Sequence, residues 1–132
     1  MAYRRFGVIC ATNFFGDILS DLASELSGGL GLAGSINASA LLCCAQAQHG
    51  SAPDITGKNI ANPTSMILSV AMLLDWMGTR HRRPEFHKAA TSMEVAVDTA
   101  LRDLLSRTVD LGGTIGTAEF GHRVANAVAQ VT

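Results

Sequence analysis

Apolar side chains recur every three or four residues along much of the chain, which is the period of an amphipathic helix. Residues 17–26 show this spacing first, and Gly28 and Gly29 are predicted to end that helix. Residues 6–11 are instead a short apolar run with β-branched members, which predicts a buried strand. Two further short strands are predicted over residues 30–33 and 41–48.

The clearest helix follows Asn62, a good N-cap, and Pro63, which suits the first helical position. It is predicted to end just before Gly78 and, being apolar nearly all round, to be deeply buried. A third helix is predicted over residues 84–106, and Thr117 is expected to cap a last one. The apolar stripes of these two helices are Phe86, Ala90, Met93, Val97, Leu101 and Leu104, and Phe120, Val124, Ala127 and Val131.

Composition sets broad limits on the class of protein. The chain has 132 residues, 48% of them hydrophobic and 16% charged, so it can bury a core. A net charge of −1 gives no reason to expect an acidic polymer, and the basic loop at residues 79–83 is not interpreted as a nucleic-acid site. The three cysteines form no disulfide or metal pattern, which fits a reducing compartment. No apolar run reaches the length of a membrane span. A cytoplasmic location is expected, with a mitochondrial one left open.

Three glycines spell G-x-G-x-x-G at Gly29, Gly31 and Gly34, and Asp54 lies at the offset of a dinucleotide fingerprint. That fingerprint needs a strand before its first glycine and a helix after its last. Here a helix precedes and a poor helix former follows. We therefore interpret these glycines as a helix terminator and close-packed backbone.

Asp17 and Asp21 are four residues apart and project from one side of the first helix. They are either a solvated acidic face or two oxygen ligands for a hard divalent cation. Residues 49–63 form a turn-rich loop that leads into the start of the apolar helix. Small residues and backbone N–H groups at such a place suit an anionic ligand, although an ordinary loop has the same composition.

Two long stretches carry a resemblance to a known family. The segments "NFFGDILSDLASELSGGLGL" and "HGSAPDITGKNIANPTSMILS" resemble the isocitrate and isopropylmalate dehydrogenases, and "RTVDLGGTIGTAEF" resembles the C-terminal segment of that family. The resemblance implies the α/β class, as a C-terminal fragment of the dehydrogenase-like fold that is rich in helices and has few strands. Residues 1–30 would supply a strand and a metal-binding helix, and residues 31–132 the C-terminal part of the cofactor domain.

The resemblance also implies a chemistry. Members of this family oxidise and decarboxylate a small 2-hydroxy acid, such as isopropylmalate, isocitrate, malate or tartrate, with NAD or NADP and with Mg²⁺ or Mn²⁺. Asp17 and Asp21 match the metal-binding aspartates, and Asn13 would lie near the nicotinamide. The loop that binds adenosine corresponds to His49, Gly50, Ser51, Ala52, Asp54, Ile55 and Asn62, in which an aspartate at position 54 goes with NAD.

The departures from the family pattern matter equally. The substrate-binding arginines, the catalytic tyrosine and lysine and a third metal aspartate have no counterpart here, and Tyr3 and Lys58 match no motif. Gln46 stands where the family usually has a glutamate. The resemblance therefore implies a truncated dehydrogenase that is inactive alone and associates as a homodimer or with a full-length homologue. The alternative is a non-catalytic module that binds NAD or a partner.

Overall fold

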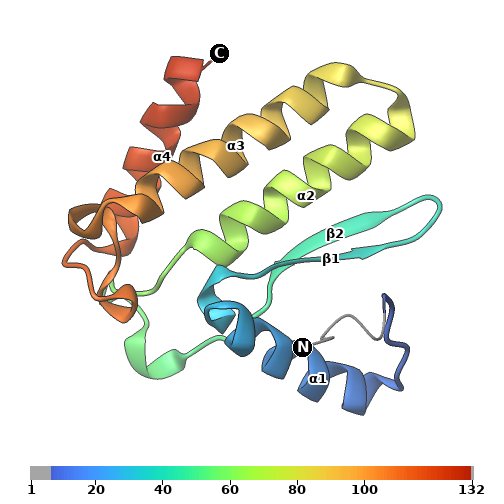
Figure 1. The fold of residues 1–132 in the computed structure, drawn as a ribbon, viewed down its shortest axis with the longest axis horizontal. Coiled ribbons are helices and arrows are strands. Elements are labelled where there is room, and N and C mark those ends of the chain that lie inside the picture. Colours follow the sequence, from blue (N-terminus) through green and yellow to red (C-terminus); the bar gives the residue numbers. More distant parts are fainter. Residues whose placement is uncertain (1–6, 132) are drawn as a thin grey trace, which may run out of the picture.

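The computed structural model describes residues 7–131. Its elements in chain order are α1 (Asn13–Ser27), β1 (Gly34–Ala38), β2 (Cys43–Ala47), α2 (Thr64–His81), α3 (Pro84–Arg102) and α4 (Thr117–Val131), with short 3₁₀ turns between them. Figure 1 shows α2 in the middle, with α3 along one side of it and the hairpin along the other. α4 packs on α3, and α1 lies at the edge of the molecule beyond the hairpin.

The core lies between α3 and α4. It contains Ala96, Val97, Ile115, Phe120 and Val124, which are at most 6% exposed. The i, i+4 spacing of Phe120 and Val124 places both side chains on one face of α4, as the sequence pattern predicts. Leu104 from the predicted stripe of the third helix is exposed instead, because α3 ends at Arg102 rather than at residue 106.

β1 and β2 pair antiparallel, with Gly34 opposite Ala47 and Ala38 opposite Cys43. The strand predicted over residues 41–48 is therefore confirmed as β2. The strand predicted over residues 30–33 is wrong, because Leu30–Leu32 form a 3₁₀ turn and β1 begins at Gly34. A Cβ on Gly34 would lie 3.0 Å from backbone atoms of α2, so this glycine lets the strand approach the helix.

Two serines of α2 fasten the hairpin to the helix. Ser69 Oγ accepts from Ser35 N at 2.9 Å and lies 2.7 Å from the carbonyl of Gln46, so it bridges a cross-strand pair. One turn earlier, Ser65 Oγ accepts from Gln48 N at 3.0 Å and donates to the carbonyl of Ala33. Both serines are fully buried, and these hydrogen bonds satisfy hydroxyls that burial would otherwise leave unpaired.

Several predictions at the ends of elements are wrong because contacts with other elements decide them. Residues 7–11 of the predicted first strand form no strand, and Val8 and Ile9 are exposed, because no strand among the described residues pairs with them. Phe6, the first residue of that prediction, lies outside the described residues. α2 continues through Gly78 to His81. Gly78 is buried, and a Cβ there would lie 2.8 Å from the His87 ring, so it serves the close approach of α2 and α3.

Two further expectations about the helices need correction. The buried residues of α2 are small, and Met66 and Met72 are exposed, so the helix is not buried all round in this chain. Thr117 begins α4, but its hydroxyl donates to the carbonyl of Ala61. The N-terminal amide of Ala118 is capped by Asn59 Oδ1 at 2.9 Å, from a loop 59 residues earlier in the chain.

Candidate functional site

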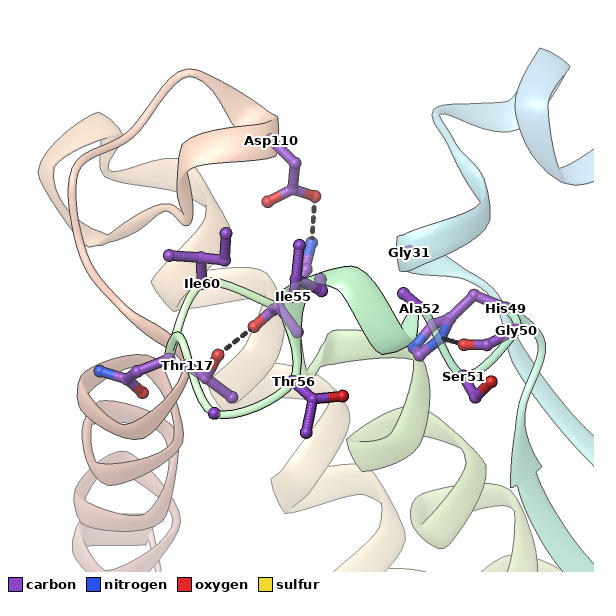
Figure 2. A pocket seen from close by; sticks show the side chains of 14 residues that line it. Gly31, His49, Gly50, Ser51, Ala52, Ile55, Thr56, Ile60, Asp110 and Thr117 are labelled. Atoms are coloured by element: carbon purple, nitrogen blue, oxygen red, sulfur yellow. Dashed lines mark hydrogen bonds between the residues drawn. The ribbon is translucent and has the colours of Figure 1, made fainter.

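A pocket of about 720 Å³ lies where the loop ahead of α2 meets two distant segments (Figure 2). Residues 49–62 form most of its wall, Gly31 closes one side, and Asp110 and Thr117 close the other. The full lining consists of Gly31, His49, Gly50, Ser51, Ala52, Ile55, Thr56, Gly57, Asn59, Ile60, Ala61, Asn62, Asp110 and Thr117.

The first part of the loop offers backbone donors. Among the described residues, the N–H groups of Gly50, Ser51 and Ala52 donate no hydrogen bond. Ala52 has φ 40° and ψ 65°, in the left-handed region that costs a non-glycine residue about 1–2 kcal/mol. His49 Nδ1 donates to the carbonyl of Gly50 at 2.9 Å, which requires the proton on Nδ1. The loop therefore presents small side chains and backbone N–H groups.

The deepest polar group in the wall is the amide of Asn62, which is 9% exposed. Its Oδ1 accepts from Thr64 N at 3.0 Å and so caps the first turn of α2. Its Nδ2 donates to Asp110 Oδ2 at 3.0 Å, which fixes the amide in one orientation (Figure 2). A Cβ on Gly31 would lie 3.4 Å from Asn62 Nδ2, so the glycine leaves this side of the amide accessible.

The charge of the lining limits the ligand class. The described lining residues include one carboxylate, Asp110, and no lysine or arginine. The walls formed by Ile55 and Ile60 are apolar. The backbone N–H of Thr64 at the start of α2 is already bound by Asn62 and is therefore not available to a ligand. Such a pocket suits a flat, largely neutral group with hydrogen-bonding edges better than a cluster of phosphates. The anionic part of a ligand would instead meet the free N–H groups of residues 50–52.

Most of the residues predicted from the sequence to bind the cofactor converge here. His49, Gly50, Ser51, Ala52, Ile55 and Asn62 line the pocket. Asp54 belongs to the 3₁₀ turn Pro53–Ile55 between lining residues, but it is exposed and is not part of the lining. Asp54 is thus next to the pocket wall in the chain, while its side chain is not part of that wall.

The predicted metal ligands do not lie in the pocket. Asp17 and Asp21 are exposed on α1, and no group of three His, Cys, Asp or Glu side chains within residues 7–131 could hold a metal ion. α1 is nevertheless joined to the end of the hairpin, because Gln48 Nε2 donates to Ser24 Oγ at 2.6 Å and to the carbonyl of Ser20 at 3.2 Å. Gln48 precedes His49, so the polar side of α1 faces the region of the loop.

Some lining residues cannot be recognised from local pattern. The sequence pattern places Gly31 in a helix terminator, and Asp110 lies in a glycine-rich loop 48 residues from Asn62, its hydrogen-bond partner. The signal for Asp110 is its place in the segment "RTVDLGGTIGTAEF", which resembles the same family. Only the fold shows that it meets the loop.

Comparison with known proteins identifies the family to which the chain belongs. A sequence model of the family described as isocitrate/isopropylmalate dehydrogenase matches residues 2–124. The chain belongs to the isocitrate/isopropylmalate dehydrogenase family. Over 128 residues it is 49% identical to the isocitrate/homoisocitrate dehydrogenase of Thermus thermophilus. This match covers 97% of this chain and 36% of that protein.

Further relatives show the same partial coverage. Over 116 residues the chain is 43% identical to the mitochondrial isocitrate dehydrogenase [NAD] catalytic subunit 5 of Arabidopsis thaliana, covering 87% of this chain and 29% of that protein. The crystal structure of isocitrate dehydrogenase from Methylococcus capsulatus matches with a TM-score of 0.78 and 43% identity, covering 88% of this chain and 33% of that chain.

The chain therefore spans about a third of the length of these relatives, and its fold is a portion of the dehydrogenase fold. Among the described residues, no helix combines the length and apolarity needed to cross a membrane.

Proposed function

We propose that the pocket holds the adenosine half of NAD, as part of a dehydrogenase that oxidises a small 2-hydroxy acid. The observation that carries this proposal is the convergence of six predicted loop residues on one cavity of about 720 Å³. The apolar walls and the Asn62–Asp110 pair suit an adenine, and the free N–H groups of residues 50–52 suit the pyrophosphate. One relative carries NAD in its name.

Asp54 gives the proposal its cofactor preference. Asp54 belongs to the 3₁₀ turn Pro53–Ile55, between the lining residues Ala52 and Thr56, and its side chain is exposed. A carboxylate there accepts hydrogen bonds from ribose hydroxyls and repels a 2′-phosphate. We expect NAD to bind more tightly than NADP, and Asp54→Lys to reduce or reverse that preference.

The described residues of this chain supply only part of a metal site. Asp17 and Asp21 supply two carboxylates on one side of α1, which matches the oxygen ligands that Mg²⁺ and Mn²⁺ prefer. Because Mg²⁺ is commonly held by one or two carboxylates with water and substrate oxygens, these two residues fit part of a site. When bound, the nicotinamide accepts a hydride and the divalent ion polarises the substrate oxygens. The remaining ligands and the acid–base groups would come from other residues.

Calorimetry tests the cofactor site directly. NAD titrated into the chain without metal should give saturable binding, and Ser51→Phe, which fills an exposed loop position in the pocket, should weaken it at least tenfold, about 1.4 kcal/mol. Thr91→Phe, at an exposed position of α3, is the matched control and should bind like the parent. No heat with millimolar NAD, or equal binding by both variants, would contradict the proposal.

The second candidate is a non-catalytic module that binds NAD or a partner chain. It is favoured by the contrast between a pocket lined by residues of this chain and the lack, within residues 7–131, of a group of three side chains that could hold a metal ion. We expect the isolated chain to bind NAD but to produce no NADH from isopropylmalate, isocitrate, malate or tartrate with Mg²⁺ or Mn²⁺. Metal-dependent NADH formation by the pure chain would rule out the module and support a complete enzyme.

A further inference from the structure

The turn between α2 and α3 carries a concentration of positive charge. Residues 79–88 contain four of the chain's ten lysines and arginines and only one of its eleven acidic residues, Glu85. The four basic residues are all exposed, and they are called here the basic turn: Arg80, Arg82, Arg83 and Lys88. Figure 1 shows this turn at the outer end of the two helices, at the opposite end of α2 from the loop that lines the pocket.

Most of these charges have no partner within the chain. Among residues 7–131, Arg83 forms an ion pair with Glu85, whereas Arg80, Arg82 and Lys88 take part in no ion pair. Each of the other arginines that the structure describes binds a carboxylate or a backbone carbonyl, and these are Arg102, Arg107 and Arg123. The described arginines that lack an ion-pair or hydrogen-bond partner therefore both lie in the basic turn.

Helix stability accounts for only part of this charge. Arg80 lies in the last turn of α2, where a cation is favourable near the negative end of the helix dipole. Arg83 is the N-cap residue of α3, where a cation is unfavourable. Arg82 ends α2 with φ 54° and ψ 44°, a left-handed conformation that favours glycine. The turn therefore keeps two arginines at positions where an uncharged residue or a glycine would be more stable.

Glu85 shows how the basic turn binds a carboxylate. Arg83 Nε donates to Glu85 Oε1, and the same guanidinium lies 5.9 Å from the centroid of the Phe86 ring, which favours this position. A backbone hydrogen bond, followed by the hydrogen bond from Arg83 and the charge of Lys88, lowers the pKa of Glu85. The ionised form of a carboxylate is thus favoured at this turn, and a guanidinium matches a carboxylate in bidentate geometry.

The surroundings of the turn narrow the class of ligand. No large apolar side chain between residues 73 and 94 is exposed, so the turn offers nothing that would insert into a membrane. Ten of the eleven acidic residues lie outside the turn, where they outnumber the lysines and arginines. A long nucleic acid would extend beyond the turn and be repelled there. A short acidic segment would contact the turn alone.

We propose that the basic turn binds a short acidic segment of a partner protein, whose Asp and Glu carboxylates pair with Arg80, Arg82 and Lys88. Because α2 has 18 residues, the turn lies about 27 Å along the helix from the pocket loop. The inference therefore depends on neither NAD nor a metal ion. Since the charges are exposed, the complex should form fast and weaken with salt.

Fluorescence anisotropy tests the proposal with a labelled peptide of about eight glutamates, which is long enough to span the turn. The expected result is saturable binding at about 50 mM salt that is lost at about 500 mM. Arg80→Gln combined with Lys88→Gln should weaken binding about fivefold or more. Lys58→Gln combined with Arg102→Gln removes the same charge from exposed positions elsewhere and should bind like the parent. All four side chains are exposed, so both double variants should keep the parent's circular dichroism.

Amide NMR spectra of the parent chain locate the contact without any substitution. The peptide should shift the amides of residues 79–88 and leave those of residues 50–52 in the pocket unchanged. A failure of NAD binding in calorimetry would not alter this result, so the two proposals can fail separately.

Three outcomes would overturn the proposal. The first is the absence of saturable peptide binding, and the second is equal binding by the two double variants. The third is tighter binding of a short DNA duplex, or of vesicles of phosphatidylcholine and phosphatidylserine, than of the peptide, since this would assign the basic turn to a nucleic acid or to a membrane.

Discussion

Single polar side chains hold together segments that are far apart in the sequence. Asn62 is the main example, because its amide caps α2 with one end and binds Asp110 with the other. Asp103 acts more locally at the end of α3, where it accepts from Ser106 Oγ at 2.9 Å and from Leu105 N at 3.0 Å. The hydrogen bonds of each residue lead to a prediction about the stability of the chain.

For Asn62 the prediction is a side-chain exchange. Asn62→Asp keeps the oxygen that caps α2 but places a second carboxylate against Asp110, so it should destabilise the chain by about 1–3 kcal/mol. The double variant Asn62→Asp with Asp110→Asn restores a carboxylate–amide pair and should recover most of the loss. Urea unfolding at pH 7 measures both. A double variant no more stable than Asn62→Asp would mean that the hydrogen bond contributes nothing.

For Asp103 the prediction is a pH dependence. The hydrogen bond from Ser106, followed by that from the Leu105 amide, lowers the pKa of this exposed carboxyl below its ordinary value. A depressed folded-state pKa contributes stability above the unfolded pKa, about 3.9, which is lost as the pH falls through the folded value. Asp103→Asn should therefore be less stable than the parent at pH 7, and the difference should shrink below about pH 4. An equal difference at about pH 7 and about pH 2.5 in urea unfolding would refute this account.

At the scale of elements, the hairpin depends on α2. Two strands alone are marginally stable in water, and here buried serine hydroxyls bridge them at successive turns of the helix. The helix thus supplies the hydrogen bonds that further strands would supply in a larger sheet. The N-terminus of α4 likewise depends on a distant side chain, because Asn59 from the pocket loop caps its first turn.

Ser69→Ala tests the bridge. The substitution leaves the amide of Ser35 and the carbonyl of Gln46 without their partner on α2, which should cost about 1–3 kcal/mol. Thr99→Ala is the control, since its exposed hydroxyl bonds only within its own helix and its loss should cost under about 0.5 kcal/mol. Thermal unfolding compares the two variants, and equal losses would show that the bridge is not a stabilising feature.

At the scale of the molecule, stability is unevenly distributed. α3 and α4 enclose the buried core, and α2 packs on both α3 and the hairpin, whereas α1 buries no residue. Local unfolding is easiest where few apolar contacts are lost. We therefore expect α1, which carries the proposed metal ligands, to be the least stable of the four helices in the isolated chain.

Hydrogen exchange measures this gradient. The amides of α1 should exchange faster than those of α2 and α3 in the isolated chain, because opening α1 exposes almost no additional apolar surface. Mass spectrometry of peptides covering Asn13–Ser27 and Thr64–His81 compares α1 with α2. Protection of α1 equal to that of α2 would mean that α1 is stabilised by contacts within this chain.

The amino-acid sequence alone determined what depends on neighbours in the chain. The periods of α1, α3 and α4, the glycine stop after α1 and the cap at Asn62 all follow from spacing within a few residues. The two long motifs likewise identified the family and six residues of the pocket wall.

Contacts between distant residues were decided only by the tertiary structure. Whether residues 7–11 or 34–38 form a strand depends on a pairing partner, and Gly78 stays inside α2 because α3 packs against it. The pocket closes because Asp110 and Thr117 are brought 48 and 56 residues back along the chain to the loop. The hydrogen bonds from Gln48 likewise decide which side of α1 faces the hairpin. Periodicity defines an apolar side of the helix but not what that side faces.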